Sequence, residues 1–171
     1  MKTIYVIFVI LFSVVLSACS SNSSATSTSS NPAKPTTTLS TEISVHEITS
    51  DFQILFNLSD PAILPKVQVV EDGSSLESDI TSTFHSSLAK TAVGARVDSV
   101  QMESSSGCTI ADQSYPCALV TYDILGPNNA PIFSTPSTGY AVFKNGKWLV
   151  SKNTICGLLA LASGGKTPQG C

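Results

Sequence analysis

The sequence predicts an α+β domain in which N-terminal helices pack on a curved antiparallel four-stranded meander sheet. Three observations support this class. Apolar residues between positions 43 and 90 recur every three or four residues, which is the period of a helix. After Gly94 the pattern changes to alternation with β-branched residues, which is typical of strands. The turns between the alternating segments are short, so neighbouring strands are expected to run antiparallel.

The first helix is predicted to begin near Ile43. Ser44 and Glu47 have the spacing of a capping box, in which two side chains satisfy free backbone N–H groups at a helix start. One face of the helix then carries the apolar residues Ile48, Phe52, Leu55 and Phe56. Residues 57–61, which end in Pro61, are expected to end it.

Two further helical segments are predicted before the sheet. Residues 62–70 form a short helix that ends at the Asp72-Gly73 turn. Ser74 and Glu77 repeat the capping-box spacing at the start of the next helix. This helix is predicted to run to about Lys90 and to bury a stripe made of Leu76, Ile80, Phe84 and Leu88.

Four strands are predicted near residues 95–103, 118–125, 132–143 and 147–152. Asn145-Gly146 lies between the last two, and this dipeptide is a strong signal for a two-residue hairpin. Pro136 interrupts the third strand, which indicates an edge, a bend or a bulge there. A last short helix is predicted at residues 153–161, before Gly164-Gly165.

The N-terminus has the features of a bacterial lipoprotein signal peptide. Lys2 forms a short positive region, residues 4–15 are almost continuously apolar, and Leu16-Ser17-Ala18-Cys19 has the form of a lipobox. The apolar run is too short to span a bilayer. We therefore expect residues 1–18 to be removed and Cys19 to carry lipid. The alternative is an ordinary secretory signal that happens to end near a cysteine.

Three regions follow from this interpretation. After the signal peptide of residues 1–18, residues 19–42 form a lipidated cysteine and a linker rich in Ser, Thr and Pro, a composition that does not fold by itself. Residues 43–171 form a single α+β domain. The protein is then expected to be exported and anchored by lipid to the outer face of the cell membrane, with the linker as a spacer.

The charge of the chain argues against nucleic acid as a partner. The formal net charge is −3 at pH 7. Removal of the signal peptide also removes Lys2, so the mature protein is more acidic still. A nucleic-acid-binding surface needs a basic stripe that displaces counterions, and the sequence has none.

Four cysteines remain besides Cys19, and in an exported chain an even number indicates disulfides. Three pairings are possible. We expect the two local pairs, Cys108–Cys117 and Cys156–Cys171, because each closes a short loop, the first beside Gly107 and Pro116 and the second at the Gly- and Pro-rich end of the chain. A metal site is the alternative, but the chain has no C-x-x-C spacing and no histidine near these cysteines.

Several short stretches in the second half of the chain carry a resemblance to a known family. They are Gly126-Pro127-Asn128-Asn129, Gly146-Lys147-Trp148-Leu149-Val150-Ser151 and Thr154-Ile155-Cys156. Together with the order of elements over roughly residues 43–162, they resemble the C-terminal domain of the mycobacterial low-molecular-weight antigen lipoproteins. The resemblance implies an exported actinobacterial envelope protein with a cystatin-like or nuclear transport factor 2-like cone and no assigned reaction. The Cys108–Cys117 loop and the cysteine tail depart from the family.

Motifs for catalysis are missing from the sequence. No nucleophile elbow, zinc-binding helix or phosphate loop occurs, so no cofactor and no metal site are predicted. His46 and His85 lie off the apolar stripes of their helices, and we expect both to face solvent. Glu71 and Asp72 precede a helix, where carboxylates interact favourably with the positive N-terminus.

A speculative pocket is predicted from Asp123, Tyr122, Tyr140 and Trp148. If Asp123 points inward, burial raises its pKa and a tyrosine donates a hydrogen bond to it, as in a proton-shuttling site. If it points outward, it is a solvated edge residue. Adjacent strand residues face opposite sides, so Tyr122 and Asp123 are not expected to line one pocket. Trp148 is expected to be a core or rim aromatic.

These observations lead to three hypotheses. The first is a non-enzymatic, membrane-anchored module that binds an apolar small molecule or another envelope protein. The second is a cone-fold isomerase or hydrolase, although fold alone does not imply a reaction. The third is a structural domain without a pocket.

Overall fold

The sheet of the protein is a four-stranded antiparallel meander in the order β1-β2-β3-β4. The computed structural model describes residues 41–86, 90–103 and 115–171. The strands are β1 (Gly94–Glu103), β2 (Cys117–Leu125), β3 (Ser137–Lys144) and β4 (Lys147–Val150). Each strand pairs with the next one in the chain. The predicted α+β class with a meander sheet is confirmed.

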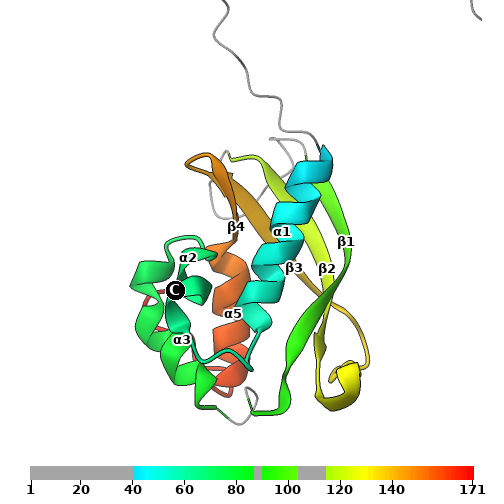
Figure 1. Ribbon diagram of the computed structural model, residues 1–171. Coiled ribbons are helices and arrows are strands. Elements are labelled where there is room, and N and C mark those ends of the chain that lie inside the picture. Colours follow the sequence, from blue (N-terminus) through cyan, green and yellow to red (C-terminus); the bar gives the residue numbers. More distant parts are fainter. Residues whose placement is uncertain (1–40, 87–89, 104–114) are drawn as a thin grey trace, which may run out of the picture. The chain divides into compact units, whose positions relative to one another are not determined.

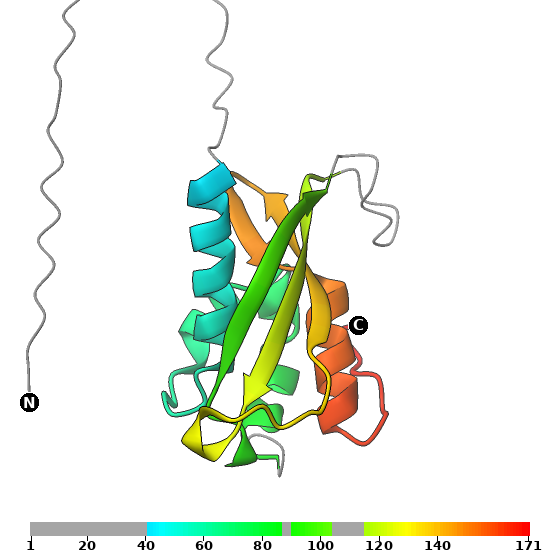
Figure 2. The same cartoon turned by 90° about the vertical axis from the view of Figure 1, so that its right-hand side faces the viewer.

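Helices cover one face of the curled sheet. They are α1 (Thr41–Phe56), α2 (Ile63–Gln68), α3 (Glu77–Phe84) and α5 (Lys152–Ala162), with short 3-10 turns η1 (Gly73–Ser75) and η2 (Pro127–Asn129). Figure 1 shows α1 across the front of the sheet with α2 and α3 beside it. Figure 2 shows the strands in front, with α1 at the left and α5 at the right of the view. No helix within residues 41–86, 90–103 and 115–171 is long and apolar enough to cross a membrane.

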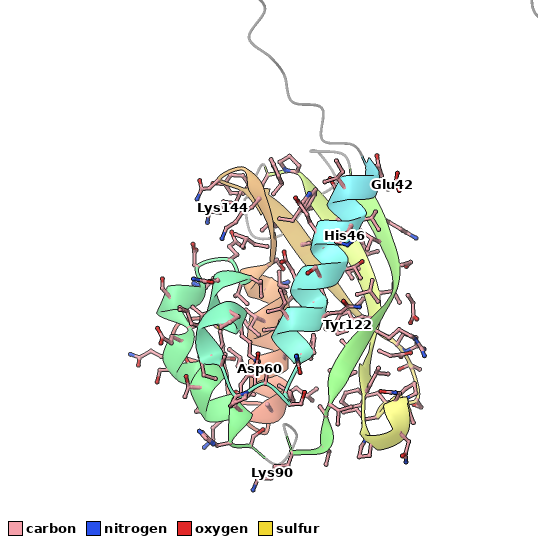
Figure 3. All side chains as sticks on the ribbon, in the orientation of Figure 1. Glu42, His46, Asp60, Lys90, Tyr122 and Lys144 are labelled. Carbon is pink, nitrogen blue, oxygen red and sulfur yellow. A yellow bond between two sulfur atoms is a disulfide. The ribbon has the colours of Figure 1, made fainter. Side chains whose placement is uncertain are left out.

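The core forms where α1 meets the middle of β2. Tyr122 of β2, which Figure 3 labels, packs against two aromatic rings of α1, with ring centroids 5.0 Å from Phe52 and 5.5 Å from Phe56. Alternate residues of a strand face the same side, so one face of β2 enters the core. The predicted stripe of α1 is confirmed, and the main contributors are Ile48, Phe52, Leu55, Phe56, Ala118, Val120, Tyr122 and Ile124.

Both predicted capping boxes are wrong. Helix α1 begins at Thr41, so Ser44 lies inside it, 3% exposed. Helix α3 begins at Glu77 with Leu76 as its N-cap residue and no side-chain cap. Ser74 instead belongs to the 3-10 turn η1, which follows Asp72 in its left-handed conformation (φ 52°). Because of this turn, α3 begins later in the sequence than predicted. Helix α3 ends at Phe84, and Leu88 lies outside the described residues.

The third strand is shorter than predicted. It begins at Ser137, directly after Pro136, because the chain first makes the turn η2. The segment that follows this turn still reaches the sheet, since Ile132 N donates to the carbonyl of Ile124 at 2.9 Å. The predicted hairpin is confirmed, because Asn145 (φ 56°) and Gly146 (φ 82°) both adopt the positive φ that a type I′ turn requires.

The last helix and its disulfide are confirmed. Ser151 caps α5, since its Oγ accepts a hydrogen bond from Thr154 N at 3.2 Å, and this cap also ends β4 at Val150. Cys156 of α5 is bonded to Cys171 across a sequence separation of 15 residues. A loop of that length contributes about 3 kcal/mol in the chain-entropy model.

The second predicted disulfide, between Cys108 and Cys117, involves a residue outside the described part of the chain. Cys117 lies at the start of β2, is 1% exposed and is disulfide-bonded. Its pairing with Cys108 stays a prediction, because Cys108 is not among the described residues.

A buried carboxylate joins three parts of the fold. Glu71 is 2% exposed and accepts hydrogen bonds from Lys144 Nζ at 3.2 Å and from Lys152 N at 3.1 Å. Its own N–H donates to the carbonyl of Val150 at 2.9 Å. Glu71 thus interacts with the N-terminus of α5 and not with that of the helix that follows it in sequence. Its neighbour Asp72 is exposed and contacts the same lysine, 3.2 Å from Nζ.

We expect Glu71→Gln to lower the free energy of unfolding by about 2 to 3 kcal/mol, because it leaves the charge of Lys144 without its buried partner. Asp72→Asn is the matched control, since it removes a charge from the same lysine at an exposed position and should cost about 0.5 kcal/mol. Asn also tolerates the left-handed backbone of Asp72. Urea denaturation of both variants measures the difference. Equal losses would contradict a special role of Glu71.

Candidate binding sites

The structure does not bring the four residues of the speculative pocket together. Tyr122 is 1% exposed and packs in the core beneath α1. Burial raises its pKa to about 12, so its hydroxyl stays protonated at physiological pH. Asp123 is the next residue of β2 and therefore faces the opposite side of the sheet, as expected from strand alternation.

On that opposite face, Asp123 is held by an arginine of the neighbouring strand. Arg96 lies directly across from it in the register of β1 and β2, and its Nη2 donates to Asp123 Oδ2. The side chain of Asp123 is 7% exposed, whereas that of Arg96 is 55% exposed. The Nε of Arg96 also donates to Asp98 at 3.0 Å. Asp123 is thus part of an ion-pair network and does not lie on the face of the sheet that the helices cover.

Tyr140 and Trp148 lie on opposite faces of the sheet as well. Tyr140 packs against a small outer cluster made of Cys117, Val142 and Leu149. Trp148 belongs to the main core and is 6% exposed, with its ring centroid 5.4 Å from that of Phe143. The expectation that Trp148 is a core aromatic is confirmed.

A small apolar cavity lies between the C-terminal end of α1, α3, β2 and α5. Its volume is about 70 Å³, and Thr83 is the one polar side chain among its lining residues. A buried water needs two to four polar partners, which such a lining does not supply, so the cavity favours apolar groups. It is lined by Leu55, Phe56, Leu58, Ile80, Thr83, Phe84, Ala92, Ile124, Ile155, Leu158, Leu159 and Ala162.

A larger polar groove lies farther toward the start of α1, where this helix meets α2 and β4. Its volume is about 260 Å³. Carboxyl, hydroxyl, amide, ammonium and indole groups all border it. The lining residues are His46, Glu47, Ser50, Asp51, Gln68, Val69, Lys147 and Trp148. This groove therefore offers a ligand hydrogen-bonding side chains together with apolar surface.

Asp51 is the most perturbed acid of this polar groove. Its pKa is raised from 3.8 to about 7, mainly by burial and in addition by the negative charge of Glu47, while the positive charge of Lys147 opposes the shift. No described residue donates a hydrogen bond to its carboxyl group. Near neutral pH the carboxyl group is therefore present in both protonation states, so it can accept and also donate a hydrogen bond.

The sequence analysis missed both sites, although one signal was present. Asp51 follows Ile48 by three residues and precedes Leu55 by four, so it lies on the apolar face of the first helix. A carboxylate at such a position becomes partly buried. The cavity gave no signal, because its lining combines residues of four separate elements whose contacts depend on tertiary packing.

The two histidines lie where the sequence analysis places them. His46 and His85 are both exposed, as predicted. Among residues 41–86, 90–103 and 115–171, no group of three or more His, Cys, Asp or Glu side chains is arranged to hold a metal ion.

Comparison with protein-family models, with curated proteins and with solved structures finds no match to this chain.

The raised pKa of Asp51 predicts a pH-dependent stability. An Asp with a folded-state pKa of about 7 instead of 3.8 binds more protons in the folded than in the unfolded state between these values. Stability therefore falls as the pH rises through this window. We expect Asp51→Asn to lose this part of the pH dependence and to be the more stable form at pH 8.

Urea denaturation of wild type and variant from pH 5 to pH 8 measures this difference. Glu47→Gln is the companion variant, because removing its charge lowers the pKa of Asp51 and moves the fall to lower pH. Parallel stability curves for wild type and Asp51→Asn would refute the assignment.

Proposed function

We propose that this protein is a membrane-anchored envelope lipoprotein whose domain binds an apolar group without catalysing a reaction. The observation that carries the binding function is the cavity of about 70 Å³ between α1, α3, β2 and α5, with its almost entirely apolar lining. The anchor and the export route are supported by the lipobox that ends at Cys19 and by the apolar run before it.

The anchor places this domain next to a source of apolar ligands. Two acyl chains on Cys19 hold a protein stably at a bilayer, because each buried methylene contributes about 0.8 kcal/mol. The Ser/Thr/Pro-rich residues 19–42 act as a spacer between the lipid and the helix that begins at Thr41. Lipids and lipid-like molecules of the envelope are therefore within reach of the domain.

The small volume of the cavity limits the ligand to a narrow apolar group. Its volume of about 70 Å³ is roughly half that of an engineered 150 Å³ cavity that holds benzene. A whole drug-sized molecule needs about 300 Å³ or more. The end of an alkyl or acyl chain fits this space best. Filling it restores packing contacts, and at about 24 cal/mol per Å³ the empty space corresponds to about 1.7 kcal/mol of lost stability.

The proposal also includes a more specific fold type and a family for this domain. A curled meander that wraps over helices supports a cone of the cystatin-like or nuclear transport factor 2-like kind. The stretch around Gly146 and Trp148 supports kinship with the mycobacterial low-molecular-weight antigen lipoproteins. An actinobacterial cell envelope is the setting that this kinship implies.

An isomerase or hydrolase of the cone type is less well supported. That alternative depended on an inward-facing Asp123, but Asp123 pairs with Arg96 on the face of the sheet away from the helices. A domain without any pocket is also less well supported, because the apolar cavity is present between α1 and α5.

Native mass spectrometry of the full mature protein, purified in detergent, tests the proposal. We expect an extra mass that leaves on extraction with organic solvent and that identifies an acyl or alkyl compound. Under denaturing conditions, the covalent mass should equal a chain that begins at Cys19 plus its lipid. A clean mass without ligand before extraction would contradict the binding function, and an unlipidated mass would contradict the anchor.

A matched pair of variants links the extra mass to the cavity. Ala162 lines the cavity, whereas Ala160 of the same helix does not. We expect Ala162→Leu to fill the space and abolish the extra mass, and Ala160→Leu to retain it. Loss of the ligand in both variants, or in neither, would show that the ligand binds elsewhere.

A further inference from the structure

The polar groove between α1, α2 and β4 is separate from the apolar cavity and shares no lining residue with it. Helix α1 packs on both α2 and β4, and Figure 1 shows these three elements as neighbours. Acceptors and donors come from different walls of the groove. Helix α1 supplies the carboxyl groups of Glu47 and Asp51, and β4 supplies the ammonium of Lys147 and the indole of Trp148.

The indole of Trp148 points to a missing hydrogen-bond acceptor. Its Nε1 is buried and has no hydrogen-bond partner among the described residues, although Trp148 lines the groove. Leaving such a donor unpaired costs about 1 to 3 kcal/mol, so native proteins rarely leave one without a reason. The indole ring packs against the ring of Phe143, with the two centroids 5.4 Å apart.

The facing wall carries two carboxyl groups, of which Glu47 is exposed and Asp51 is partly buried. Glu47 and Asp51 are four residues apart on α1 and therefore lie side by side on one face of the helix. No described residue donates a hydrogen bond to Asp51. Lys147 lies across from them but directs its Nζ to the carbonyl of Gln68 at 3.2 Å. A ligand in the groove would thus meet two carboxyl groups on one side, and the buried Nε1 of Trp148 would reach it only if the indole ring turned toward the groove.

We propose that this groove binds a sugar ring through its hydroxyl groups. A hydroxyl group donates one hydrogen bond and accepts two, so adjacent hydroxyls can bind the carboxyl groups and also accept from the indole N–H once its ring has turned toward the groove. Ser50 and Gln68 add side chains that both donate and accept. The volume of about 260 Å³ lies just below the range of drug-sized pockets, which suits a single ring.

The balance of charge favours a neutral ligand over a cation. Lys147 offsets the charge of Glu47, and Asp51 has a pKa of about 7, so its charge is only partial near neutral pH. A cationic ligand would also meet the ammonium group of Lys147. The metal alternative fails on geometry, since the described side chains form no ligand cluster.

The single tryptophan of the chain makes the groove directly observable. The full mature protein, in a detergent that contains no sugar, is titrated with the methyl α-glycosides of glucose, mannose and galactose while Trp148 emission is recorded. We expect a saturable change with at least one of them. Ala162→Leu, which alters only the apolar cavity, should leave this response unchanged.

Two variants test the assignment to the groove. Asp51→Ala should weaken sugar binding by about tenfold, which corresponds to the loss of one hydrogen bond to a charged or partly buried group. Gln68→Ala should also weaken binding, because Gln68 lines the groove. It should not affect the fold, because the side chain of Gln68 is exposed. Gln53→Ala is its control, because Gln53 is equally exposed on α1 but does not line the groove.

The binding measurements distinguish a sugar site in the groove from the alternatives. Weaker binding in Asp51→Ala and Gln68→Ala, with wild-type binding in Gln53→Ala, supports the proposal. An unchanged emission with every glycoside overturns it. So does a saturable response to tetramethylammonium or spermidine without any response to sugars, since this would identify a cation site.

Discussion

The arrangement of this domain depends on the buried carboxylate of Glu71. Its two oxygens contact the end of β3 through Lys144 and the first turn of α5 through Lys152 N, and its backbone N–H pairs with Val150 of β4. Val150 N in turn donates to the carbonyl of Val69, so the segment after α2 continues the sheet edge. Because a buried carboxylate is costly unless its hydrogen bonds are satisfied, these segments are held in one relative position.

Both candidate sites depend on that position. Helix α5 supplies one wall of the apolar cavity, and β4 supplies Lys147 and Trp148 to the polar groove. Helix α1 borders both sites, with Leu55 and Phe56 at the cavity and Glu47 and Asp51 at the groove. The partly buried Asp51, and the buried Trp148 N–H that has no partner among the described residues, both lower the stability of the fold.

The elements of the domain were largely predictable from the sequence, whereas the sites were not. Periodicity identified the buried face of α1, and Asn145-Gly146 identified the hairpin, because both signals are local. The capping boxes failed at Ser44 and Ser74, since an earlier helix start and the turn η1 replaced them. Pairing of Asp123 with Arg96 across two strands depends on register, which the sequence does not specify.

The apolar cavity is the central element of the proposed function, and xenon binding tests it most directly. Xenon enters dry apolar cavities. Carbon-13 methyl spectra of the protein under xenon pressure should show saturable shifts for Ile124, Leu158 and Leu159, which line the cavity, and none for the exposed Leu64. Absence of shifts at the three lining residues would mean that this region is fully packed, and the proposed binding of an apolar group would be wrong.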